Sequence, residues 1–318
     1  MPKFVFFNYG NGYEKCILNA VEGERNVLFY KKFSLKIIQK IFEIHNSWTL
    51  NRKYELPFKN IWFKHCLQDV PNNEEVYFIF YEAFHLSYSK KFLNYIKLNY
   101  KDAKLCFMFS NPVDEYNLHK LSVVKTYYDG IITFCKDDAE RYGFLFLENW
   151  LFKVPLMLDK IEPQYDVFFV GANKGRLKQL LEIYEQLVAA NLKCDFHITG
   201  VEEDQQKYAN DIVYNIKMSY DEVLYRVQNS RCVLEVLQGS NCYMSIRTLE
   251  AMQYHKKLLT TNQAVHNHSM YDSNIIQIID EEKKFDIDFL KENVDEKVYP
   301  DINLWTYKAF EKFILDNI

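Results

Sequence analysis

An arginine and a glutamate stand three residues apart in the stretch Ile246-Arg247-Thr248-Leu249-Glu250. Residues at this spacing share one face of a helix. The pair follows an apolar run that ends near Val236, so it lies where a strand passes into a helix. There a carboxylate can accept hydrogen bonds from sugar hydroxyls and a guanidinium can hold a phosphate. The alternative is a surface ion pair of little energetic weight. Three apolar neighbours favour a packed helix with a directed polar face: Ile246, Leu249 and Met252.

A second group of residues suited to anion binding is Gly171-Ala172-Asn173-Lys174-Gly175-Arg176, which follows a strand-like run and opens a helical one. Glycine permits close approach of a backbone, the N–H groups of a helix start favour an anion, and Lys174 and Arg176 add positive charge. The loop lacks the GK[ST] ending of a Walker loop and the GxGxxG spacing of a dinucleotide site. An ordinary tight turn with solvated basic residues explains it equally well.

Three side chains in the first half of the chain could act as a general base towards an acceptor hydroxyl: Glu82, His85 and Asp114. Each follows an apolar strand-like run, where ligands of open α/β sheets bind. A single histidine after such a run is more often structural than catalytic. Asp137 and Asp138 are better interpreted as the first turn of a helix than as a metal-binding DxD motif. We therefore predict no metal site.

Composition narrows the class of protein. The chain has 318 residues, 48% of them hydrophobic and 26% charged, which is typical of a globular protein of two domains. A net charge of −4 disfavours bulk nucleic-acid binding. The seven cysteines show no metal-like spacing, and the start of the chain does not resemble a signal peptide. With no apolar run of membrane-spanning length, we expect a reduced, cytoplasmic protein.

Short apolar runs alternate with longer amphipathic segments throughout the chain. Such alternation predicts parallel sheets with helices on both faces, that is, an α/β protein. Expected strands lie within residues 3–12, 25–30, 74–85, 103–116, 128–135, 165–176, 193–200, 232–236, 258–262 and 274–279. Expected helices lie within residues 34–48, 89–100, 136–143, 177–191, 214–231, 245–257 and 303–318, the range 214–231 beginning with a short extended piece.

The alternation is interrupted at residues 148–164, which contain two prolines and no sustained period. We predict a linker there, between an N-terminal doubly wound domain at 1–150 and a second one at 165–300. The C-terminal helix, 301–318, could cross back to the first domain. Ligands of such sheets bind outside the carboxyl ends of the strands. That rule directs attention to the strand ends at 8–12, 82–85, 110–114, 171–176 and 199–200, and to the stretch around Arg247.

Residues 31–65 combine positive charge with apolar side chains. The range holds eight Lys and Arg residues against Glu43 and Glu55. A basic, aromatic surface suits peripheral contact with an anionic membrane that carries a lipid-linked acceptor. An amphipathic helix packed on the sheet, with solvated lysines, is the more ordinary interpretation.

Several strings resemble a known family. "YDVFFVGANKGRLKQLLEIYEQL", "SIRTLEAMQYHKKLLTTN" and "NIIQII" are similar to the C-terminal half of bacterial GT-B glycosyltransferases, closest to those that make capsular polysaccharide and lipopolysaccharide. "YDGIITFCKDDAERYGF" resembles the segment before the linker of these enzymes. The likeness covers residues 129–279, about half of the chain, and its specific part is "RTLEA" followed by "KKLLTTN". It implies two Rossmann-like domains that face a cleft, the GT-B architecture.

The resemblance also implies roles for individual residues. Glu250 would bind the ribose of a nucleotide-sugar, Lys174 and Arg176 would lie near its diphosphate, and Arg247 near phosphate or sugar. The strand-end glycines would permit close approach of the donor, and residues 215–218 would contact the base. The complete set of implied donor-binding residues is Gly171, Asn173, Lys174, Arg176, Gly200, Met218, Arg247, Thr248 and Glu250.

The chain departs from the family at one position that matters for the chemistry. Many retaining members have a second glutamate eight residues before the ribose-binding one, where this chain has Cys242. Glu235 lies on the preceding strand and does not replace it. The stereochemistry of transfer is therefore left open. The charge that develops on the nucleoside diphosphate would be stabilised by Lys174, Arg176, Arg247 and helix-start amides, with no metal or other cofactor.

From these features we expect a metal-independent glycosyltransferase of cell-surface polysaccharide synthesis. It would move a sugar from a nucleotide-sugar to a glycan or lipid-linked acceptor, in the cytoplasm or at the inner face of the cell membrane. No nucleic-acid partner is expected. Two alternatives stay open: an enzyme like the nucleotide-sugar 2-epimerases, and a non-catalytic GT-B partner of a glycosyltransferase. The sugar, base, acceptor and oligomeric state are not specified by the sequence.

Overall fold

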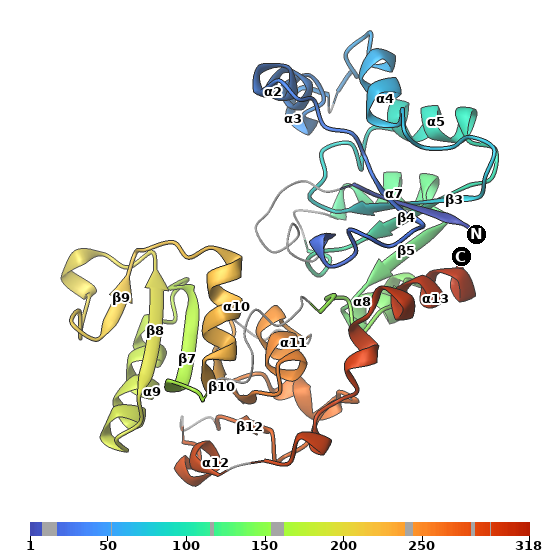
Figure 1. Ribbon diagram of the computed structural model, residues 1–318. Helices are drawn as coiled ribbons and strands as arrows, with labels where there is room; N and C mark the ends of the chain where they lie inside the picture. Colours follow the sequence, from blue (N-terminus) through green and yellow to red (C-terminus); the bar gives the residue numbers. More distant parts are fainter. Residues whose placement is uncertain are drawn as a thin grey trace. The chain divides into compact units, whose positions relative to one another are not determined.

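The protein divides into two compact units, Met1–Trp150 with Tyr307–Ile318, and Leu151–Thr306 (Figure 1). The computed structural model describes residues 1–7, 18–51, 53–114, 118–153, 162–238, 244–280, 284–292 and 294–318, without the Trp48 side chain. The strand end at 8–12, Cys16, Cys242 and residues 154–161 of the predicted linker lie outside the described residues. Each unit is a parallel sheet with flanking helices, so the predicted fold class, two doubly wound α/β domains, is confirmed.

The N-terminal unit contains a six-stranded sheet in the order β2-β1-β3-β4-β5-β6, with every neighbouring pair parallel. Its strands are β1 (Lys3–Phe7), β2 (Val27–Phe29), β3 (Val76–Tyr81), β4 (Ala103–Met108), β5 (Gly130–Thr133) and β6 (Leu145–Phe146). Every residue of β3 is buried, as expected for a strand covered on both faces.

The helices of this unit are α2 (Lys36–His45), α3 (Trp48–Asn51), α4 (Asn60–Cys66), α5 (Lys90–Asn99), α7 (Leu121–Tyr127), α8 (Lys136–Tyr142) and α13 (Tyr307–Asn317). The last of these follows the C-terminal unit in sequence but packs on β1, where Phe310 lies against Phe6 and Tyr307 against Phe4. Asp137 and Asp138 occupy the first turn of α8, as predicted. The short β6, α3, α4 and α7 have no counterpart in the sequence prediction.

Aromatic rings fill the core of the N-terminal unit. Phe7 stacks on Phe80 with a centroid separation of 4.2 Å and on Phe84 at 5.1 Å. Tyr30 also stacks on Phe7, and Phe92 meets it edge to face. Large planar side chains bury much apolar area each, so a modest sheet acquires a substantial core. Aromatic residues make up 17% of the chain, and those in this core have a packing role.

The C-terminal unit holds a second parallel sheet, in the order β12-β11-β10-β7-β8-β9. Its strands are β7 (Tyr165–Ala172), β8 (Cys194–Thr199), β9 (Ile212–Tyr214), β10 (Ser230–Glu235), β11 (Lys257–Thr260) and β12 (Ile276–Ile278). The chain builds outwards from β7 through β8 to β9, then returns to the other side of β7 with β10. The order therefore reverses between β7 and β10, which is the switch point of the sheet.

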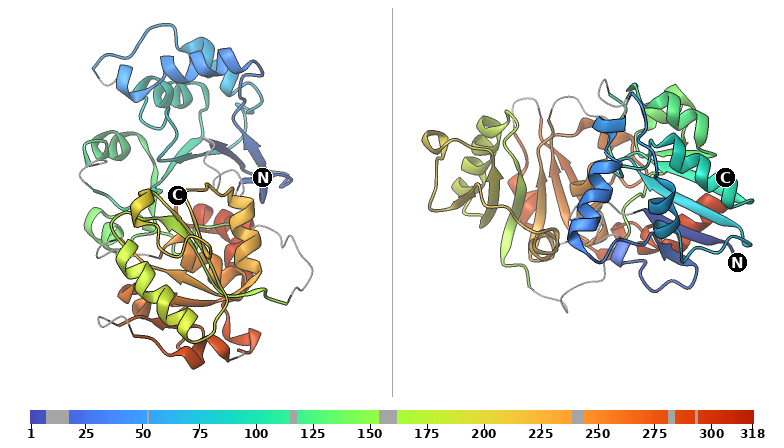
Figure 2. Two further views of the ribbon diagram at one scale, coloured as in Figure 1. Left: turned by 90° about the vertical axis from the view of Figure 1, so that its left-hand side faces the viewer. Right: turned by 90° about the horizontal axis from the view of Figure 1, so that it is seen from above.

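The α-helices of this unit are α9 (Leu177–Ala189), α10 (Tyr220–Gln228), α11 (Ile246–Gln253) and α12 (Ile287–Lys291). Short 3-10 turns occur at Glu203–Gln205, Gln263–Asn267, Glu296–Val298 and Ile302–Trp305. One face of the sheet carries α9, and the opposite face carries α10 and α11 side by side (Figures 1 and 2). Serine residues cap the two adjacent helices, Ser219 at α10 and Ser245 at α11.

A buried ion-pair group fastens α10 to the sheet. Asp195 on β8 bonds to His197 Nε2 at 2.8 Å and to Arg226 Nη1 of α10 at 2.7 Å. The hydrogen bonds from His197 and Arg226 outweigh burial and lower the pKa of Asp195.

No helix in the described part of the chain is long and apolar enough to span a membrane.

Candidate functional site

The switch point of the C-terminal sheet brings together the segments that the sequence singled out. The loop that begins at Gly171 leaves the carboxyl end of β7, and α11 begins after β10, the neighbouring strand. Ligands of open α/β sheets bind at this position. The predicted donor residues of both segments therefore share one edge of the sheet.

Asn173 shapes the loop after β7. Its backbone N–H donates to Thr199 O at 2.7 Å, and its Oδ1 accepts from Leu177 N at 3.0 Å in the first turn of α9. Lys174 follows in the left-handed region, with φ 44°. Its ammonium group is exposed and makes no hydrogen bond with any described residue. Asn173 thus serves the turn, whereas Lys174 is accessible to an anion.

Arg176 is held by the ends of two strands. Its Nε and Nη2 donate to Ala172 O of β7 at 3.2 and 3.1 Å, and Nη1 donates to Val236 O after β10. The guanidinium also lies 5.6 Å from the centroid of the Phe169 ring. Burial lowers its pKa, although the Glu235 carboxylate acts in the opposite direction. Arg176 therefore ties β7 to β10, while the sequence suggested a diphosphate contact.

Gly171 leaves room for this guanidinium. A Cβ at position 171 would lie 2.7 Å from Arg176 Nη2 and 3.2 Å from Phe169 Cζ. The absence of a side chain therefore serves an internal contact. The sequence associated the same glycine with close approach of the donor.

Glu250 and Arg247 form the pair expected on one face of α11. Arg247 Nη1 bonds to Glu250 Oε2, and the Glu250 side chain is completely buried while that of Arg247 is 19% exposed. Glu250 Oε1 has no hydrogen-bond partner among the described residues. Burial raises the pKa of Glu250, and the charge of Arg247 together with hydrogen bonds from Tyr220 and Arg247 partly offsets that effect. A buried carboxylate oxygen without a donor costs free energy, so this atom has capacity for a ligand hydroxyl.

Glu250 is more deeply buried than its position on the predicted helix indicated. The sequence favoured a polar face directed at the ligand, but a fully buried carboxylate is reached only if a covering side chain moves. Tyr220, the first residue of α10, lies beside it, and burial together with the charge of Glu250 raises the pKa of Tyr220 strongly.

A second buried glutamate was missed as a site residue. Glu235, the last residue of β10, is 3% exposed and accepts hydrogen bonds from three hydroxyl groups. Thr248 Oγ1 donates to Glu235 Oε1 at 2.9 Å, Ser245 Oγ donates to the same oxygen, and Thr260 Oγ1 donates to Oε2. These bonds fix the first turn of α11 against β10 and β11. The sequence feature that could have identified Glu235 is its position as a charged residue at the end of an otherwise apolar run.

Thr248 is therefore fully buried and committed to Glu235, although the resemblance placed it among the donor-binding residues. Gly200 adopts φ 72°, and a Cβ there would meet no atom within 4 Å. Its N–H donates to Asn215 Oδ1 at 2.8 Å, which links the ends of β8 and β9. Met218 is half-buried beyond β9. Gly200 and Met218 thus lie on the β8–β9 side of the switch point.

The three candidate bases of the N-terminal unit have different surroundings. Glu82 Oε2 accepts from Ser110 N at 3.2 Å, and Asp114 is exposed. His85 packs against the rings of Phe42 and Phe84 and lines a cavity of about 260 Å³. Burial, with a contribution from Lys59, lowers the pKa of His85 to about 4. A histidine with that pKa is a weak base at neutral pH.

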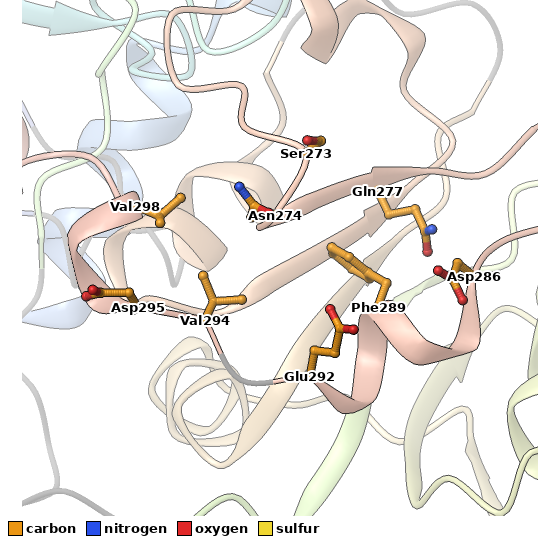
Figure 3. A pocket seen from close by; sticks show the side chains of 9 residues that line it. All are labelled: Ser273, Asn274, Gln277, Asp286, Phe289, Glu292, Val294, Asp295 and Val298. Carbon is orange, nitrogen blue, oxygen red and sulfur yellow. The ribbon is translucent and has the colours of Figure 1, made fainter.

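A cavity of about 410 Å³ in the C-terminal unit lies away from the switch point. Ser273 and Asn274, which line it, precede β12, and Asp286, Glu292 and Asp295 face it from the other side (Figure 3). It therefore opens near the amino end of β12, and no predicted site residue lines it. Within the described ranges, no group of three or more His, Cys, Asp or Glu side chains is arranged to hold a metal.

No protein-family model and no curated protein matches the chain. Solved structures do. An α-glucosyltransferase in complex with UDP and a 13-mer DNA with a central A:G mismatch is 14% identical, with 100% of this chain and 96% of that chain covered and a TM-score of 0.54. UDP-GlcNAc 2-epimerase from Neisseria meningitidis, bound to UDP-GlcNAc, is 10% identical, with coverage of 99% and 100% and a TM-score of 0.52. At such identities the likeness concerns the fold alone, and the chain has the two Rossmann-like units of the GT-B fold.

Proposed function

We propose that this protein is a glycosyltransferase that moves a sugar from a nucleotide-sugar to a glycan or lipid-linked acceptor in cell-surface polysaccharide synthesis. The observation that carries the proposal is the Glu250 carboxylate beside the switch point. Arg247 holds one of its oxygens, and the other, Oε1, is buried and has no donor among the described residues. A ribose hydroxyl supplies the missing donor, and a charge-assisted bond of this kind is among the stronger hydrogen bonds.

The leaving diphosphate would be stabilised by groups at the same edge of the sheet. Lys174 offers an exposed ammonium group, Arg247 a partly exposed guanidinium, and the start of α9 the positive end of its helix dipole. These positive groups favour the charge that develops as the sugar leaves. We assign no metal to this step, so transfer should persist in EDTA.

The acceptor side of the proposal involves a membrane. Eight of the nineteen large hydrophobic side chains that are exposed among the described residues fall within 31–65: Leu35, Ile37, Ile41, Ile44, Leu50, Tyr54, Phe58 and Ile61. On α2 they form one stripe, flanked by exposed Lys36 and Lys40. A bilayer with anionic headgroups accepts both kinds of side chain, whereas a DNA backbone gains nothing from exposed isoleucines. We therefore place the protein at the inner face of the cell membrane.

The catalytic part is tested by incubating the protein with UDP-, GDP- and CDP-sugars and following each donor by NMR. Release of the nucleoside diphosphate with transfer or slow hydrolysis of the sugar supports a glycosyltransferase. Conversion to an isomeric nucleotide-sugar without an acceptor supports the epimerase alternative instead. Binding without turnover, with every acceptor tried, supports a non-catalytic partner. If no nucleotide binds at all, the proposed donor site is wrong.

The membrane part is tested by sedimentation with vesicles of anionic or neutral lipid, and with duplex DNA as a competing ligand. The wild type should sediment with anionic vesicles and lose that binding in the double variant Ile37→Ser/Ile41→Ser. Leu98→Ser is the matched control, because Leu98 is 85% exposed but lies on α5. Equal sedimentation of both variants would exclude the α2 stripe. Binding to DNA in preference to vesicles would point to a nucleic-acid acceptor.

A further inference from the structure

The N-terminal unit contains a polar cavity that the donor site does not use. Its volume is about 260 Å³, and its lining includes Asn46, Lys53, Glu55, Lys59, Ser89 and Lys90. The segment between α2 and α4 forms one wall, and the start of α5 forms another. His85, which follows β3, also lines it, so the cavity lies at the carboxyl edge of the sheet, where ligands of such sheets bind.

Lys59 is the unusual residue of this cavity. Only 2% of it is exposed, and its Nζ makes no hydrogen bond with the part of the chain that the structure describes. Burial and the charge of Lys91 lower its pKa, while Glu55 acts in the opposite direction. A buried ammonium group without a partner is costly, so native proteins normally pair it.

The carboxylate that acts electrostatically on Lys59, that of Glu55, already accepts other hydrogen bonds. Glu55 Oε1 accepts from Ser89 Oγ at 2.9 Å, and Oε2 accepts from Lys91 N at 3.2 Å in the first turn of α5. Glu55 therefore caps α5 and supplies Lys59 with no hydrogen bond. Within the described lining Glu55 is the one acidic side chain, whereas Lys53, Lys59 and Lys90 are all basic. The lining carries a net positive charge.

A second polar group in the lining of the cavity, the side chain of Asn46, also has a buried atom without a hydrogen-bond partner among the described residues. The Nδ2 group of Asn46 donates to Phe42 O at 2.8 Å, but its Oδ1 is buried without a hydrogen-bond partner among the described residues. Water can accept from Lys59 Nζ and donate to Asn46 Oδ1, yet water does not neutralise an ammonium charge. An anion with an attached hydroxyl provides the charge for Lys59 and a donor for Asn46.

We propose that this cavity binds a phosphate group of the acceptor, with Lys59 as its central ligand and Lys53 and Lys90 at its rim. As a statement about the acceptor, this rests on the proposed glycosyltransferase function. The binding of phosphate itself does not, because all of the residues involved belong to the N-terminal unit. Tetrahedral oxyanions suit a compact ammonium group with several donors around it.

The test compares three proteins by calorimetry with inorganic phosphate and pyrophosphate at neutral pH: the wild type, Lys59→Met and Lys97→Met. Lys97 is the matched control, an exposed lysine in the last turn of α5. A lost charge-assisted hydrogen bond of about 1.5–3 kcal/mol weakens binding by about 10- to 150-fold. We expect that loss in Lys59→Met and an unchanged affinity in Lys97→Met.

Thermal unfolding gives a second measurement. In phosphate-free buffer Lys59→Met should melt at a higher temperature than the wild type, because it removes an unpaired buried charge. Phosphate should raise the melting temperature of the wild type and leave that of Lys59→Met unchanged. The rim variant Lys53→Met/Lys90→Met keeps Lys59 and should bind phosphate several-fold more weakly.

Three results would overturn the inference: equal phosphate affinity in wild type and Lys59→Met, a lower melting temperature of Lys59→Met without phosphate, or no effect in the rim variant. Nucleotide titrations separate this outcome from failure of the proposed function. If Lys59→Met binds nucleotides like the wild type but not phosphate, the cavity is a separate site. If the wild type binds phosphate through Lys59 but no nucleotide, the glycosyltransferase proposal fails and the phosphate site stands.

Discussion

Replacing Glu250 with glutamine removes one charge from the C-terminal unit with little change of shape. Arg247 donates a hydrogen bond to Oε2 of this carboxylate, and Oε1, which has no donor among the described residues, can bind a ligand. Glutamine retains an acceptor of similar position but loses the charge that makes a bond to a ribose hydroxyl strong. The difference should therefore appear in nucleotide affinity.

The size of the effect follows from a single hydrogen bond. Since one oxygen is available, one charge-assisted bond of about 1.5–3 kcal/mol is weakened, which corresponds to about 10- to 150-fold in Kd. Stability should change less, by about 1 kcal/mol. Burial already raises the pKa of Glu250, and the partly exposed Arg247 can turn towards water once its partner is neutral.

The assay is calorimetry with UDP, GDP and CDP and with their 2′-deoxy and 3′-deoxy analogues. Glu222→Gln is the matched control, because Glu222 makes a half-exposed i,i+4 pair with Arg226 on the neighbouring helix. If Glu250 binds a ribose hydroxyl, the wild type should discriminate against the analogue that lacks it. Glu250→Gln should discriminate little, since the two changes remove the same bond.

Two results would refute the reasoning. Nucleotide affinity equal within twofold in wild type and Glu250→Gln would leave the carboxylate without a ligand role. Equal discrimination against the deoxy analogues in both proteins would show that the hydroxyl is bound elsewhere. In either case the buried Arg247–Glu250 pair is a structural feature of α11.

Three further changes test the surrounding structure. Glu235→Gln should lower the free energy of unfolding by about 2–4 kcal/mol in urea denaturation, because three hydroxyl donors and Arg176 lose the buried charge with which they interact. The control Glu222→Gln should change the free energy of unfolding by less than about 0.5 kcal/mol. Gly171→Ala should cost about 1–3 kcal/mol, since its Cβ would lie 2.7 Å from Arg176 Nη2; a neutral result would mean that the guanidinium moves without penalty. His85 has a pKa of about 4 when folded and an ordinary value of 6.5, so the unfolded state binds more protons between these pH values and stability rises with pH across that window, by at most about 3 kcal/mol. His85→Leu should flatten this rise in urea titrations from pH 4 to 7, and an unchanged slope would contradict the buried, neutral state of His85.

The fold could be predicted from local sequence patterns because each longer strand or helix has its own periodic arrangement of apolar residues. The run Val76-Tyr-Phe-Ile-Phe-Tyr81 is apolar throughout and is buried on both faces. The stretch that forms α11 combines a serine cap with apolar residues at helical spacing. Short elements such as β6, with two residues, have no period to detect. They form because neighbouring strands supply their hydrogen bonds.

The partners of polar side chains could not be predicted in the same way. Lys174 and Arg176 are both basic residues of one loop, and sequence gives no reason to separate them. In the fold, Arg176 has the reach to bond both Ala172 O and Val236 O, 60 residues away in sequence, while Lys174 stays exposed. Thr248 likewise finds Glu235 only because α11 packs on the face of the sheet to which Glu235 points.

The hydrogen bonds of Arg176 and Glu235 also fix the geometry of the donor site. Arg176 joins β7 to β10, and Glu235 joins β10 to α11 and β11, so the loop before α9 and the first turn of α11 are fixed to the same pair of strands. Because Glu235 is buried and Arg176 is held by three hydrogen bonds, Lys174 and the Arg247–Glu250 pair keep a constant relation to each other without direct contact. A site that holds a diphosphate at one end and a ribose at the other needs that constancy. Loss of Glu235 should therefore weaken nucleotide binding along with stability, although Glu235 itself touches no ligand group.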